Sequence, residues 1–148
     1  MARVINSVWI DGPVEQVFDL VTTTQYWPQW HPATVGVGGV TERPIALGDV
    51  IHERARIGGR MYEGDWTVAE HVRPARVMLQ AGSGRLHISY TFRAAGAATE
   101  FERTLEYRPE DFAQAGADPA AVEALMYGQS EQGLQKLKRL VEALLHRD

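Results

Sequence analysis

Two charged side chains fall at apolar positions of predicted strands and are the strongest sign of chemistry in this sequence. In the predicted strand 50–57, Glu53 shares the alternating phase of three apolar residues, and in the predicted strand 99–108 Arg103 does the same. A buried unpaired charge costs several kcal/mol. We therefore expect Glu53 and Arg103 either to pair with each other or to meet polar groups of a ligand. A purely structural role for Arg103 is the alternative.

Aromatic side chains on the same inner phases form the second candidate group. They suit a flat or ring-containing ligand, with tyrosine hydroxyls as hydrogen-bond donors, while packing in a solid core is the alternative for each. On the inner face of the predicted C-terminal helix, a glycine would leave room for a cavity. The residues predicted to line this cavity, besides Glu53 and Arg103, are Trp27, Trp30, Tyr62, Trp66, Tyr90, Phe92, Phe101, Tyr107, Met126 and Gly133.

Signatures of metal or nucleophilic chemistry are missing from the sequence. The chain has no cysteine, and its five histidines never occur in HxH or HExxH spacing. It also lacks the GxSxG, P-loop and GxGxxG patterns. We expect no metal and no cofactor. Among the histidines, His31 lies in a corner that could border the cavity mouth, with a solvated surface position as the alternative.

Length and charge bound the class of protein. A chain of 148 residues predicts a single domain, 1–148. The net charge of −4 and the scattered basic residues argue against nucleic-acid binding. Stable membrane insertion is not expected either, because no apolar run approaches the ~20 residues that span a bilayer. The first residues lack the apolar core of a secretory signal, which predicts a cytoplasmic location.

The spacing of apolar residues predicts the helices and strands that must position these side chains. A helix is expected to start at Pro13, with an apolar stripe at i, i+3, i+4 and i+7, before a second short helix in an aromatic corner. Asp118 and Pro119 predict the start of a long helix that ends near Leu145. Alternation and turn residues predict about seven strands: 4–10, 34–41, 50–57, 61–70, 76–81, 85–93 and 99–108. This order predicts an α+β helix-grip fold, a curved antiparallel sheet around the C-terminal helix.

The same order resembles a known superfamily. The segments SVWIDGPVEQVFDLV, YWPQWHP, GRLHISYTFRAAGAATEFERTLEY and LQKLKRLVEALL are similar to the START-related, birch-pollen-allergen-like proteins (SRPBCC), in their bacterial polyketide cyclase/dehydrase and lipid-transport branch. The resemblance covers nearly the whole chain. It implies a hydrophobic cavity between sheet and helix that takes lipids, sterols, hormones or polyketides.

Two functions from different classes follow. The first is binding or carriage of a hydrophobic, lipid-like or polyketide-like small molecule. The alternative is a polyketide cyclase or dehydratase, with Arg103 anchoring an enolate or carboxylate, Glu53 as acid or base, and Tyr62 or Tyr107 as donor. A third hypothesis is that the protein is an interaction module for other proteins. Trp9 falls on the wet phase of the first strand, which predicts a homodimer anchored by this side chain.

Overall fold

Seven antiparallel strands form one curled sheet in the computed structural model, which describes residues 1–146. The strand order is β1-β7-β6-β5-β4-β3-β2, so β1 and β2 are the two edges. The strands are β1 (Ala2–Asp11), β2 (Thr34–Gly39), β3 (Val50–Ile57), β4 (Arg60–Val72), β5 (Arg76–Ala81), β6 (Leu86–Ala95) and β7 (Ala98–Tyr107). All seven predicted strands are confirmed, with ends displaced by at most two residues.

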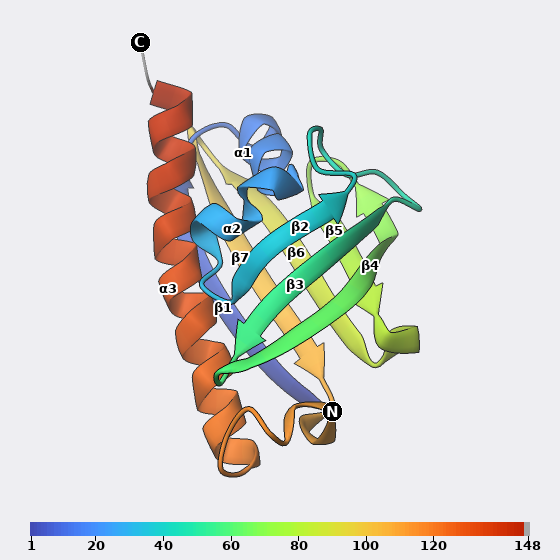
Figure 1. The fold of residues 1–148 in the computed structure, drawn as a ribbon. Coiled ribbons are helices and arrows are strands. Elements are labelled where there is room, and N and C mark those ends of the chain that lie inside the picture. The colour runs from blue at the N-terminus through green and yellow to red at the C-terminus, as the bar shows by residue number, and fades with distance from the viewer. Residues whose placement is uncertain (147–148) are drawn as a thin grey trace.

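Helices cover one face of this sheet. The helical elements are α1 (Val14–Val21), η1 (Thr24–Tyr26), α2 (Trp27–Trp30), η2 (Gly82–Gly84), η3 (Pro109–Phe112) and α3 (Pro119–His146); the η elements are short 3-10 segments, and η2 lies in the connection between β5 and β6. Figure 1 shows α3 running along the concave side of the sheet, with α1 and α2 nearer its carboxyl end. The predicted helix-grip α+β fold is therefore confirmed.

The first helix begins one residue later than predicted. Pro13 has φ −64° and ψ 144°, an extended conformation, so it is the N-cap rather than the first helical residue. Its carbonyl accepts the first helical hydrogen bond, from the N–H of Val17 at 3.0 Å. The predicted stripe packs inward, with Val17, Phe18 and Val21 fully buried.

The long helix α3 has the N-cap and the buried apolar face that its sequence predicts. The Asp118 side chain accepts a hydrogen bond from the N–H of Ala121 at 2.8 Å. Seven residues of α3 are buried: Val122, Met126, Ser130, Gly133, Leu134, Leu137 and Val141. None of the helices within residues 1–146 is both long enough and apolar enough to cross a membrane.

The hydrophobic core fills the end of the sheet that α1 and α2 cover. Phe18 of α1 packs on Phe92 with ring centroids 4.9 Å apart, and Phe92 packs on Phe101 at 5.1 Å. Trp30 of α2 lies 6.4 Å from Tyr90. At the other end of the concave face, Phe112 of η3 and Met126 of α3 border an unfilled space.

Candidate functional site

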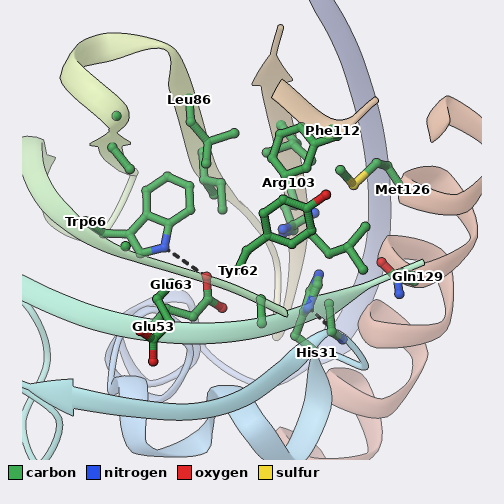
Figure 2. A pocket seen from close by; sticks show the side chains of 18 residues that line it. His31, Glu53, Tyr62, Glu63, Trp66, Leu86, Arg103, Phe112, Met126 and Gln129 are labelled. Atoms are coloured by element: carbon green, nitrogen blue, oxygen red, sulfur yellow. Dashed lines mark hydrogen bonds between the residues drawn. The ribbon is translucent and has the colours of Figure 1, made fainter. Parts of the chain in front are cut away.

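A cavity of about 250 Å³ lies between the sheet and α3. Its wall combines strands β3, β4, β6 and β7 with η3, α3 and the corner after α2 (Figure 2). The wall is mostly apolar, with a minority of polar side chains. The apolar residues include Ala33, Ala55, Ile57, Leu86, Ile88, Leu105, Phe112 and Met126; the polar ones include His31, Glu53, Tyr62, Glu63, Arg103 and Gln129, and the indole of Trp66 joins them.

The structure places five of the predicted site residues in this wall and seven outside it. Glu53, Tyr62, Trp66, Arg103 and Met126 line the cavity. Those that do not are packed in the core or at the contact between helix and corner: Trp27, Trp30, Tyr90, Phe92, Phe101, Tyr107 and Gly133.

Gly133 faces protein rather than empty space. A Cβ atom built at this position would lie 3.2 Å from the Trp30 carbonyl oxygen, 3.2 Å from Pro32 Cδ and 3.5 Å from His31 Cα. The glycine therefore allows α3 to approach the backbone of the α2 corner closely. The expectation that it leaves space for a ligand is wrong, because the aromatic corner occupies that space.

Glu53 is held by two hydrogen bonds within the wall. The Thr34 hydroxyl donates to Oε2 at 2.6 Å, and the Trp66 indole N–H donates to Oε1 at 3.0 Å, the dashed line beside Trp66 in Figure 2. Each carboxylate oxygen thus accepts one hydrogen bond within the wall. This arrangement orients the indole ring of Trp66 along the cavity wall.

Arg103 is the most deeply buried charged side chain of the site, with only 4% of its surface exposed. Its Nη1 donates to the Ser130 hydroxyl of α3 at 3.1 Å, and its Nε has no hydrogen-bond partner within residues 1–146. Direct pairing of Glu53 with Arg103, one of the two expected outcomes, is not observed, because no acidic group in the described chain lies within 4.0 Å of the guanidinium. The strands that carry them, β3 and β7, are separated by three others.

His31 also lines the cavity, although it was not among the predicted cavity residues. Its Nδ1 accepts a hydrogen bond from the N–H of Ala33 at 3.2 Å, so the neutral ring carries its proton on Nε2. Burial holds the pKa of His31 well below 6.5, and the positive charge of Arg103 lowers it further. In Figure 2 the ring points into the cavity. His31 is therefore a neutral donor at pH 7.

The three tyrosines predicted for the site differ in their surroundings. The Tyr62 ring extends across the cavity toward Phe112, with centroids 5.1 Å apart. Burial raises the pKa of Tyr90 to about 12, while the Arg103 guanidinium opposes that rise. Burial also raises the pKa of Tyr107, whose hydroxyl is buried without a partner in the described chain. Both remain neutral phenols.

A polar surface groove of about 420 Å³ adjoins the cavity at the start of β4. Tyr62 and Glu63 line both the groove and the cavity. Across the groove, Asp111 of η3 accepts two hydrogen bonds from Arg85, at 2.9 and 2.7 Å. Tyr62 and Glu63 therefore stand between the interior and this groove.

Acid should destabilise the protein through His31. Its pKa is lowered in the folded state, so below about pH 6.5 the unfolded chain takes up a proton that the folded chain does not. The stability associated with the neutral ring is complete above pH 6.5 and is lost as the pH falls toward the lowered folded pKa. Urea midpoints measured between pH 7.5 and 5.5 should fall less steeply for His31→Asn than for the wild type.

The exposed His52 provides the control for that comparison. It lies on the outer face of β3, beside Asp65 at 2.9 Å. His52→Asn should leave the loss of stability below pH 6.5 in place. A wild-type slope retained in His31→Asn would show that another group titrates.

Comparison with known proteins places the chain in a family. The family described as "Polyketide cyclase / dehydrase and lipid transport" matches residues 1–142. The chain belongs to this family. The predicted membership of the START-related, birch-pollen-allergen-like superfamily is thereby confirmed. No curated protein matches the sequence.

Solved structures agree with the family in fold. A START superfamily protein from Mycobacterium smegmatis has 17% identity and a TM-score of 0.73, covering 96% of this chain and 98% of that one. The Zhui aromatase/cyclase from Streptomyces sp. R1128 has 15% identity and a TM-score of 0.71, with coverage of 98% and 96%. Ara h 8.0201 has 12% identity and a TM-score of 0.63, with coverage of 95% and 97%. At these identities the likeness concerns the fold alone.

Proposed function

We propose that this member of the polyketide cyclase/dehydrase and lipid-transport family binds a compact hydrophobic molecule between the sheet and α3. The cavity carries the proposal: a mostly apolar wall with a few convergent polar groups is typical of small-molecule sites. Its volume of about 250 Å³ lies just below the roughly 300–1,000 Å³ of pockets for drug-sized ligands. A one- or two-ring compound or a short alkyl chain suits this space better than a two-chain lipid.

Filling the cavity should weaken binding. Ala55 lines the wall and is the cross-strand neighbour of Tyr62, so a phenyl ring at this position would occupy the space of the ligand. We expect Ala55→Phe to weaken binding of 2-acetonaphthone, a neutral two-ring probe, at least ten-fold by isothermal titration calorimetry.

The matched control places the same substitution outside the cavity. Ala94 is an exposed alanine of β6, and Ala94→Phe should bind the probe as the wild type does. Circular dichroism checks that both variants are folded. If folded Ala55→Phe bound the probe as tightly as the wild type does, the cavity would not be the binding site.

Cyclisation or dehydration of a polyketide-like chain is the second candidate function. One observation favours it: His31, Tyr62 and Arg103 bring a neutral imidazole, a phenol and a guanidinium to one cavity. The other predicted acid or base, Glu53, already accepts two hydrogen bonds, and Tyr107 does not line the cavity. The small volume further disfavours a long polyketide chain, so binding is the function we place first.

Self-association and location remain predictions from the sequence. Trp9 is 54% exposed, and Ile5 on the same face of β1 is 46% exposed. These side chains fit the predicted homodimer, which light scattering at micromolar concentration would exclude if it finds a monomer. The cytoplasmic location likewise remains a prediction.

A further inference from the structure

We propose that the cavity contains an anion site, in which Arg103 and His31 hold the ionised carboxylate of a compact apolar acid. This inference rests on the proposed binding function and names the chemical class of its ligand. It starts from the charge of Arg103, since a guanidinium remains protonated in proteins.

The hydrogen bonds of Arg103 are incomplete. A guanidinium has five N–H donors in a planar fork. Within residues 1–146, one donates to Ser130 at 3.1 Å, the neutral Tyr90 hydroxyl on the neighbouring strand lies within hydrogen-bonding reach, and Nε is buried without a partner. Because the side chain is 4% exposed and lines the cavity, its unused donors can be satisfied only from the cavity or from neighbouring side chains.

The neighbouring side chains do not neutralise this charge. Asn6 is the cross-strand neighbour of Arg103 on β1, and its Oδ1 is also buried without a partner. An amide oxygen could accept one N–H bond, but it carries no charge. Glu53 accepts hydrogen bonds from Thr34 and Trp66 and lies more than 4.0 Å from the guanidinium. Within residues 1–146 the guanidinium therefore has no counter-anion, and a carboxylate matches the geometry of its fork.

His31 supplies a second donor without adding charge. Its Nε2–H is free of the Ala33 hydrogen bond, and the ring points into the cavity. A neutral imidazole can donate to an anion while avoiding repulsion of the adjacent guanidinium. An anion in the cavity can therefore accept hydrogen bonds from the cationic guanidinium of Arg103 and from the neutral imidazole of His31.

The rest of the wall defines the apolar part of the ligand. Leu86, Ile88, Leu105 and Phe112 provide aliphatic and aromatic surface, and the indole of Trp66 provides a flat one. Together with the small volume, this surface fits a planar aromatic acid of one or two rings, or a short alkyl acid.

Two isosteric probes test the inference by calorimetry at pH 7. 2-Naphthoate carries a carboxylate where 2-acetonaphthone carries a neutral acetyl group, so their difference reports the charge. We expect the wild type to bind 2-naphthoate at least ten-fold more tightly than the ketone. Arg103→Met should abolish this preference while retaining binding of the ketone. Arg103→Gln should do the same and serves if the methionine variant does not fold.

The control is Arg93→Met, which removes an exposed arginine that pairs with Glu100 on the outer face of the sheet. It should keep the preference for naphthoate, which would exclude a general effect of net charge. Equal binding of both probes by the wild type, or a preference that survives in both Arg103 variants, would overturn the anion site and leave the proposed binding function standing. Binding of neither probe would overturn both.

Discussion

Replacing Arg103 with methionine should stabilise the ligand-free protein by at least about 1 kcal/mol, because replacing even a compensated buried ion pair by apolar residues of similar volume often gains about 1–4 kcal/mol. Within residues 1–146, the guanidinium is buried, has no carboxylate within 4.0 Å and is bonded to the neutral hydroxyls of Ser130 and Tyr90. Methionine keeps a long unbranched side chain in the same space. The substitution removes the hydrogen bond from Arg103 to the Ser130 hydroxyl, but this hydroxyl can instead donate to a backbone carbonyl of its own helix. Urea unfolding at pH 7 measures the difference.

Two variants separate the charge from other effects. Arg103→Lys places an ammonium group there that loses either its hydration or its proton on burial, so it should gain less stability than Arg103→Met. Arg93→Met removes an exposed, paired arginine and should change the free energy of unfolding by no more than about 1 kcal/mol. Lower stability of Arg103→Met than of the wild type would mean that the guanidinium is already compensated in the ligand-free protein.

This expectation links stability to binding. A buried group that destabilises the empty protein but can complete its hydrogen bonds with a ligand is a common compromise at functional sites. A bound acid should make the wild type more stable than Arg103→Met, because the acid binds only the folded state and binds the wild type more tightly. Saturating 2-naphthoate should therefore raise the unfolding midpoint of the wild type more than that of Arg103→Met.

The fold was predictable because periodicity reports which face of an element is buried. Alternation in β6 and β7 gave the inner faces correctly, and the Asp118–Pro119 start of α3 follows from capping preferences alone. The same phase analysis singled out Glu53 and Arg103, since a charge at an apolar position stands out in a short strand. Both side chains line the cavity.

The alternation of apolar and polar residues could not predict which inward residues line the cavity and which pack in the core. Alternation shows which face of a strand is buried but not the position along the strand, and the cavity occupies one end of the concave face. Tyr90 and Phe92 share the phase of Leu86 and Ile88, yet they lie under α1 and α2 while the other two line the cavity. For His31 the sequence left a place at the cavity mouth and a solvated surface position open, because this residue follows a four-residue helix and belongs to no periodic pattern.

Gly133 marks a close contact whose disruption should have a large effect. Gly133→Leu is expected to cost at least the roughly 1–3 kcal/mol typical of overpacking, because even the Cβ atom would lie 3.2 Å from the backbone oxygen of Trp30. A longer side chain must push the α2 corner away from α3. Since that corner carries His31 and Ala33, the cavity wall should shift as well. Urea unfolding gives the cost, and near-ultraviolet circular dichroism of the tryptophans reports the movement of the corner.

The same helix offers a matched position at Gly128, where nothing lies within 4 Å of an added Cβ. Gly128→Leu should stabilise the protein by up to about 1 kcal/mol, because leucine favours the helical conformation more than glycine does. The two leucine variants differ only in what the new side chain meets, so their difference isolates the contact between α3 and the corner. If Gly133→Leu were as stable as Gly128→Leu, the corner would be free to yield, and the close approach of its backbone would contribute nothing to the position of His31.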